Sequence, residues 1–300
     1  MMKPPGRPHF LICIGGEAFS EDTIRFGARC AAALEADISV LYVAPATPHA
    51  MRDETRLVRE KLRQWEIDHP GVRVLRYARE VLASMGLVAT DITGDIVRRH
   101  ELRPGINGAY ELHLVGGYGE EVRLRMREGK IVEEIVHELE ARQYTIVVVG
   151  APRKRRLLHE IVQFANASVL VAKNAHRDYY DLLLPMDDSE AARRARDLAG
   201  IAARALNLEV VVLSVAETDE QREQAQALAE HEAGHLRRRS IRAAARSAVG
   251  DVVEEICRAA GDDHIIVLGG SRQHQLWMYL FGNRPIRVVQ RAQSPVLVVK

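Results

Sequence analysis

Short runs rich in Val and Ile alternate with longer amphipathic segments along most of the chain. The runs at residues 10–14, 39–43 and 146–149 are typical of parallel strands that are covered on both faces. Four segments carry apolar residues every three or four positions, as helices do, at residues 23–34, 130–139, 191–206 and 252–259. This alternation of strands and helices predicts an α/β fold with right-handed crossovers.

The sequence also contains an internal repeat. Residues 9–44 align without a gap on residues 181–216, at a shift of 172 positions. Three later segments recur in the same order: residues 132–135 at 253–256, residues 147–150 at 266–269, and residues 169–171 at 296–298. We therefore expect two domains of one fold, a first at residues 1–176 and a second at residues 177–300.

The first copy is longer than the second. The shift between the copies falls from 172 to 121 after the second strand, so the first copy carries 51 extra residues there. We expect this insertion at about residues 72–120, with a helix at about 72–85 and a hairpin of strands 110–114 and 122–126. Its position and size make it a candidate surface for a protein partner or an oligomer contact.

Three segments of the second copy resemble a known family. They are residues 182–189 (Leu-Leu-Leu-Pro-Met-Asp-Asp-Ser), residues 265–269, and residues 294–299 (Ser-Pro-Val-Leu-Val-Val). With these segments the chain resembles the tandem form of the universal stress protein family, over nearly its whole length apart from the insertion. The resemblance implies two Rossmann-like, adenine nucleotide alpha hydrolase-like domains. Each would be a five-stranded parallel sheet of order 3-2-1-4-5 with helices on both faces.

The resemblance also implies how the copies associate. In the family's tandem form, two copies pair as an intramolecular pseudo-dimer through their last strands, here residues 169–172 and 296–299. A homodimer of whole chains is a further expectation.

Nucleotide-binding members of the family hold phosphate with the pattern Gly-x2-Gly-x9-Gly-Ser/Thr after the fourth strand. Glycine lets backbone N–H groups approach an anion closely. The second copy keeps this spacing, with Arg272 in place of a Gly and Asn283 in place of Ser or Thr. The resemblance further implies adenine and ribose contacts near Asp187 and Val215. The candidate site for ATP or AMP therefore comprises Met186, Asp187, Asp188, Val215, Gly269, Gly270, Ser271, Arg272, Gly282 and Asn283.

Two interpretations of Arg272 are open. Its guanidinium could bind phosphate in place of the lost glycine, or its side chain could fill the pocket so that no nucleotide binds. The first copy departs further from the pattern, because eight residues are missing after Arg153 and Gly15 stands where the second copy has Asp187. We expect no nucleotide site in the first copy.

A separate motif indicates a different kind of chemistry. Residues 231–235 read His-Glu-Ala-Gly-His, the HExxH pattern in which two His hold zinc and the Glu acts as a base. The motif lies in a polar segment, Gly234 weakens a helix by about 1 kcal/mol, and no third ligand can be assigned. A zinc-dependent hydrolase is therefore a remote alternative. We assign no metal and keep His231 and His235 as weak candidates.

Charge and composition exclude several classes of protein. The 42 basic and 41 acidic residues leave a net charge of +1, so no global field attracts nucleic acid. No apolar run reaches the roughly 18 residues of a membrane span, and the three cysteines form no CxxC pair. We expect a cytoplasmic, non-enzymatic binding module that regulates a stress response, with its nucleotide site lost in the first copy and degenerate in the second. The main alternative is an ATP- or AMP-binding member with slow hydrolysis.

Overall fold

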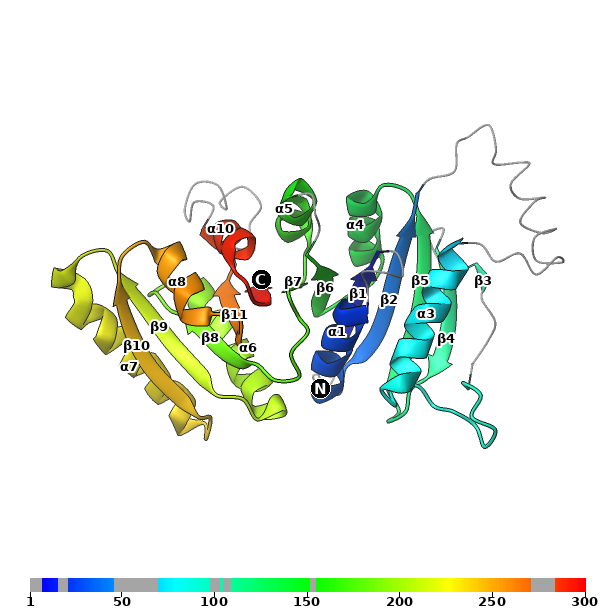
Figure 1. Ribbon diagram of the computed structural model, residues 1–300, viewed down its shortest axis with the longest axis horizontal. Coiled ribbons are helices and arrows are strands. Elements are labelled where there is room, and N and C mark those ends of the chain that lie inside the picture. The colour runs from blue at the N-terminus through cyan, green and yellow to red at the C-terminus, as the bar shows by residue number, and fades with distance from the viewer. Residues whose placement is uncertain are drawn as a thin grey trace, which may run out of the picture. The chain divides into compact units, whose positions relative to one another are not determined.

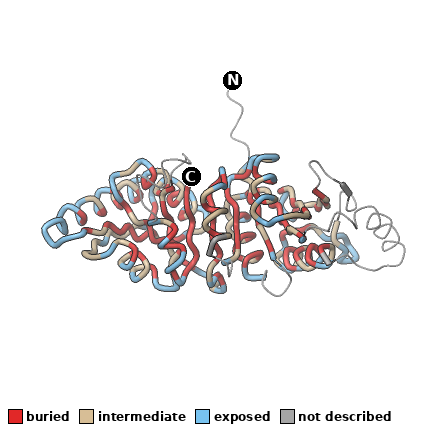
Figure 2. The backbone as a smooth tube through the Cα atoms, turned by 90° about the horizontal axis from the view of Figure 1, so that it is seen from above, coloured by how far each residue is buried: buried red, intermediate tan, exposed pale blue. Residues whose placement is uncertain are grey.

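The computed structural model of the chain describes residues 7–15, 21–45, 70–97, 103–104, 109–151, 155–270 and 284–300. The chain divides into two compact units, Met1–Gly150 and Ala151–Lys300. In both units the central strands are the most buried elements, and the outer faces of the helices are exposed (Figure 2). No helix in the described parts of the chain is long and apolar enough to cross a membrane.

The second unit contains the second copy of the repeat (Figure 1). Its elements are α5 (Arg155–Phe164), β7 (Ser168–Ala172), β8 (Asp181–Pro185), α6 (Glu190–Leu206), β9 (Val210–Ala216), a 3-10 turn (Asp219–Gln221), α7 (Arg222–Arg238), β10 (Ala243–Val249), α8 (Val252–Ala260), β11 (His264–Gly269), α10 (Arg284–Arg291) and β12 (Val296–Val299). Strands β8 to β12 form a parallel sheet in the order β10-β9-β8-β11-β12. This order is the 3-2-1-4-5 arrangement that the family resemblance implied.

Strand β7 ends the first copy of the repeat but pairs within the second unit. It runs antiparallel to β12, with Leu170 opposite Leu297. Further bonds join the same two segments, since the Lys300 N–H donates to Ser168 Oγ at 3.2 Å and the Asn174 amide donates to the Gln293 carbonyl at 2.8 Å. The predicted pairing of the two last strands is therefore confirmed.

The first unit contains β1 (His9–Ile14), α1 (Glu21–Ala33), β2 (Asp37–Ala44), α3 (Pro70–Ser84), β3 (Arg103–Pro104), β4 (Tyr110–Val115), β5 (Glu121–Glu128), α4 (Ile131–Ala141) and β6 (Ile146–Gly150). Its strands have the order β6-β1-β2-β5-β4-β3. Strands β6, β1, β2 and β5 are parallel, and β4 and β3 extend the sheet as antiparallel strands.

The register of β5 changes the interpretation of the insertion. Strand β5 pairs in parallel with β2, as β10 pairs with β9, and α3 comes between β2 and β5 as α7 comes between β9 and β10. Helix α3 and strand β5 therefore belong to the repeated fold. The segment expected as one insertion at about 72–120 is thus divided, and the extra chain lies before α3 and between α3 and β5.

A cluster of charged residues is buried between β5 and α4. Arg125 is 1% exposed, and its Nε lies 2.9 Å from the Glu138 carboxylate, which is fully buried. Glu138 also lies 3.4 Å from Arg127 and accepts a 2.6 Å hydrogen bond from the Tyr144 hydroxyl. Arg125 makes a second ion pair with Glu111 of β4. This cluster connects α4, β4, β5 and the chain that leads into β6.

Candidate functional site

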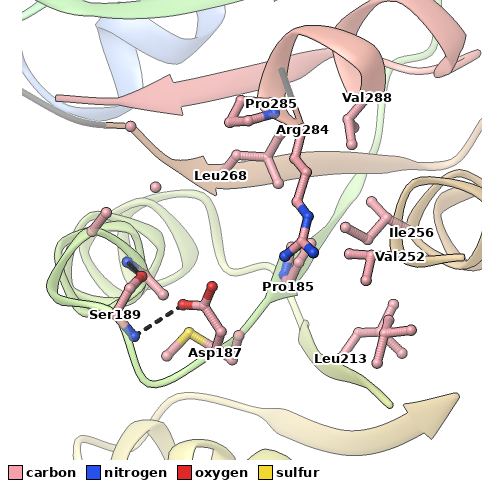
Figure 3. Close-up of a pocket in the computed structure, with 16 residues that line it drawn as sticks. Pro185, Asp187, Ser189, Leu213, Val252, Ile256, Leu268, Arg284, Pro285 and Val288 are labelled. Atoms are coloured by element: carbon pink, nitrogen blue, oxygen red, sulfur yellow. Dashed lines mark hydrogen bonds between the residues drawn. The ribbon is translucent and has the colours of Figure 1, made fainter. Parts of the chain in front are cut away.

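The strand order of the second unit reverses at β8. The chain passes from β8 to β9 on one side, and β11 is added later on the other side. In open α/β sheets, ligands bind outside the carboxyl ends of the strands at such a reversal. The structure has a cavity of about 150 Å³ at this position, lined by the ends of β8, β9 and β11 and by α6, α8 and α10 (Figure 3).

Half of the predicted site residues line this cavity. They are Met186, Asp187, Val215, Gly269 and Gly270. Asp188 is adjacent in sequence but is not among the lining residues. Ser271, Arg272, Gly282 and Asn283 lie outside the described residues.

The walls of the cavity are mainly apolar. Leu213, Ile256, Leu268 and Val288 are all buried lining residues. A cavity of about 150 Å³ accommodates a ring of the size of benzene, whereas pockets for complete ligands measure about 300–1,000 Å³. The cavity therefore has room for a ring system and is smaller than a pocket for a complete ligand, and we call it the ring slot.

Asp187 and Arg284 are the charged residues among the described lining. Asp187 Oδ1 accepts a 3.0 Å hydrogen bond from the backbone N–H of Ser189, which fixes the turn after β8. The Ser189 hydroxyl in turn caps α6 by accepting a 3.1 Å bond from the Ala192 N–H. The cap and the turn together hold the Asp187 carboxylate at the amino end of α6, where the helix dipole favours a negative charge.

Gly269 and Gly270 serve the packing of the second unit. A Cβ atom on Gly269 would lie 2.6 Å from the Ala192 nitrogen and closer still to the backbone of Ala191. The Gly270 N–H donates to the Val299 carbonyl at 2.6 Å, and its carbonyl accepts a bond from Arg194 at 2.8 Å. The Gly270 N–H is therefore already bonded within the protein, and Gly269 is required by the close approach of α6.

The sequence prediction missed the residues that α8 and α10 contribute. Val252 and Ile256 of α8 form one wall, and Arg284, Pro285 and Val288 of α10 form another. A signal for α8 was present, because Ile256 ends the repeated Val-Glu-Glu-Ile segment. No pattern in the sequence marks Arg284, since its role depends on where α10 begins.

The HExxH residues lie on α7. His231 is exposed and His235 is half-buried, and their Nε2 atoms are 3.2 Å apart. The intervening Glu232 is buried and forms a 2.7 Å ion pair with Arg196 of α6. A hydrolase of this class needs the glutamate free to act as a base beside the metal. The Glu232–Arg196 pair argues against this alternative.

Comparison with known proteins gives one family. The model of the universal stress protein family matches residues 6–176 and 179–300. No curated protein sequence matches the chain.

Two solved structures share the fold of nearly the whole chain, and a third is similar to a smaller part of it. A universal stress protein from Archaeoglobus fulgidus DSM 4304 is similar over 97% of this chain and 98% of its own, with a TM-score of 0.60 at 15% identity. A functionally unknown protein from Pseudomonas aeruginosa PAO1 is similar over 98% of this chain and 93% of its own, with a TM-score of 0.55 at 15% identity. A universal stress protein solved in complex with cAMP is similar over 40% of this chain and 96% of its own, with a TM-score of 0.34 at 22% identity.

Proposed function

Because the chain belongs to the universal stress protein family, we propose that it is a non-enzymatic regulatory module whose second copy binds the base of an adenine nucleotide. The observation that carries the proposal is the apolar cavity at the strand-order reversal, which is lined by Asp187 and Val215. A base inserted between apolar side chains would be desolvated there, and its sugar would lie near the Asp187 carboxylate.

Features of the sequence and of the structure support weak binding in the second copy and no binding in the first. Arg272 and Asn283 replace residues of the phosphate pattern, and the Gly270 N–H is bonded to Val299. In the first copy, Gly15 replaces Asp187 and offers no carboxylate to a sugar. We therefore expect one nucleotide per chain, held mainly through its base and sugar.

A binding role without catalysis also agrees with the lining. Hydrolysis of a phosphate ester needs a group that can take a proton from water. The described lining contains no histidine, and its carboxylate, Asp187, is engaged with the Ser189 N–H. These residues support a module that senses a ligand rather than one that converts it.

Calorimetric titration of the full chain with adenosine and AMP tests the proposal. Val215→Trp should abolish binding, because the larger side chain fills the slot. Val43→Trp is the matched control, since Val43 occupies the equivalent position at the end of β2 in the first copy. Circular dichroism checks that both variants are folded. Absence of binding in the wild type, or loss of binding in Val43→Trp alone, would refute the proposal.

A further inference from the structure

We infer that Arg284 makes the second-copy cavity select a nucleoside with a single phosphate over both the free nucleoside and the triphosphate. The inference rests on the proposed function, because it concerns the ligand of the same cavity. It goes further in naming the residue that binds the anionic group and the number of phosphates that the site favours.

The first argument is the position of Arg284. It is the first residue of α10, and its side chain reaches from the helix toward Pro185, into the cavity that Asp187 enters from the turn after β8 (Figure 3). Arg284 also lines a neighbouring groove of about 390 Å³, together with Glu217, Asp251 and Arg287. Its guanidinium therefore lies where the ring slot meets the groove. A substituent that extends from a bound nucleoside toward the groove passes this group.

The second argument is that Arg284 is weakly held. It forms an ion pair with Glu217, 3.6 Å away, and the two side chains are 56% and 70% exposed. An ion pair this exposed contributes little to stability. A phosphate offers two oxygens to the planar guanidinium and binds it more strongly than one distant carboxylate. A phosphate can therefore replace Glu217 as the partner of Arg284.

The third argument is the charge of the groove. Among its described residues, two guanidinium groups are matched by two carboxylates, because Arg284 lies 3.6 Å from Glu217 and Arg287 lies 3.6 Å from Asp251. The Asp251 carboxylate is fixed, since it caps α8 by accepting a 3.0 Å bond from the Glu254 N–H. A second and a third phosphate would have room in the groove but would meet carboxylates there. We therefore expect the fixed Asp251 carboxylate, rather than the size of the groove, to disfavour a second and a third phosphate.

The test compares adenosine, AMP and ATP by calorimetry on the full chain. In the wild type, AMP should bind about tenfold more tightly than adenosine, as one charge-assisted contact at a partly exposed site allows, and ATP should bind no more tightly than AMP. Arg284→Gln should lower the affinity for AMP by about tenfold and leave that for adenosine unchanged. Glu217→Gln should raise the affinity for AMP, because it removes the competing carboxylate.

Arg287→Gln is the matched control. Arg287 lies on the same helix and loses the same charge, but it lines the groove and not the ring slot. This variant should keep the wild-type ratio of AMP to adenosine affinity. Tighter binding of ATP than AMP, or an equal loss of adenosine and AMP binding in Arg284→Gln, would overturn the inference alone. If neither adenosine nor AMP binds, the proposed function fails and the inference fails with it.

Discussion

His9 shows how burial changes the chemistry of a single residue. Its Nε2 lies 2.9 Å from Ser39 Oγ, and its ring centroid lies 4.5 Å from that of Tyr144. Burial, followed by the positive charge of Arg123, lowers the pKa of His9 to about 4. The folded chain therefore keeps His9 neutral at pH values where an unfolded histidine is already protonated.

The direction of the resulting pH dependence follows from linkage. Between pH 6.5 and about 4 the unfolded chain binds the proton and the folded chain does not, so stability falls as the pH is lowered through this range. His9 lowers the free energy of unfolding by up to about 3 kcal/mol over this range. Urea unfolding, followed by a signal from the first unit, measures the free energy of unfolding at several pH values. This free energy should depend less on pH in His9→Gln than in the wild type. His137→Gln, at an exposed position, should keep the wild-type slope; equal slopes in all three proteins would contradict the prediction.

At the scale of elements, the docking of α4 on β5 depends on charges as well as on apolar contacts. Glu138 is fully buried and contacts Arg125, Arg127 and Tyr144. Removing one partner of a buried ion pair leaves the other charge without compensation, which costs about 3–5 kcal/mol.

We therefore expect Glu138→Ala to destabilise the first unit by about 3 kcal/mol or more. Glu133 gives a control on the same helix, because it forms a 2.7 Å ion pair with Lys130 in which both side chains are exposed. Glu133→Ala should change stability by about 0.5 kcal/mol or less. Urea midpoints of the two variants measure the difference, and similar midpoints would show that the buried cluster does not hold α4 in place.

The elements also show what sequence patterns can and cannot predict. The apolar runs predicted the parallel strands, because burial on both faces leaves a strong local pattern, whereas the order of the strands in the second copy was implied by the family resemblance. The place of strand β5 in the sheet was harder to predict. Its alternating Val-Arg-Leu-Arg-Met-Arg pattern indicates a hairpin strand but does not reveal that the strand also pairs with β2.

Only part of the candidate site could likewise be predicted from the sequence. The family resemblance identified Asp187 and Val215, which lie at the carboxyl ends of consecutive strands and near each other in any fold of this order. Arg284 and Val252 come from helices whose positions depend on tertiary packing. The glycine at position 269 was explained by phosphate binding, whereas its neighbours Ala191 and Ala192 show that packing alone requires it.

At the scale of the whole molecule, the boundary of the repeat and the boundary of the compact units differ. The family model ends its first match at residue 176, but the second unit begins at Ala151 and includes α5 and β7. The second copy alone therefore lacks the strand that covers the edge of β12. An uncovered edge strand presents unpaired backbone groups to other chains.

This difference predicts the behaviour of two fragments. Residues 177–300 should dimerise or aggregate through β12, because the edge of this strand is exposed without β7. Residues 151–300 retain β7, which covers the edge of β12, and should have a higher urea midpoint. Light scattering and urea unfolding measure both properties. A monomeric 177–300 fragment as stable as the longer one would contradict the prediction.

The pairing of β7 with β12 has a consequence for how the two copies can diverge. Leu170 and Leu297 are equivalent positions of the repeat and lie opposite each other, with valines opposite valines on both sides. A residue that meets its own equivalent is the mark of a two-fold interface between identical subunits. In a dimer of identical chains, every mutation at such an interface appears twice. Here one gene encodes both sides, so a change can be inherited on one side alone, and each copy is free to acquire its own task.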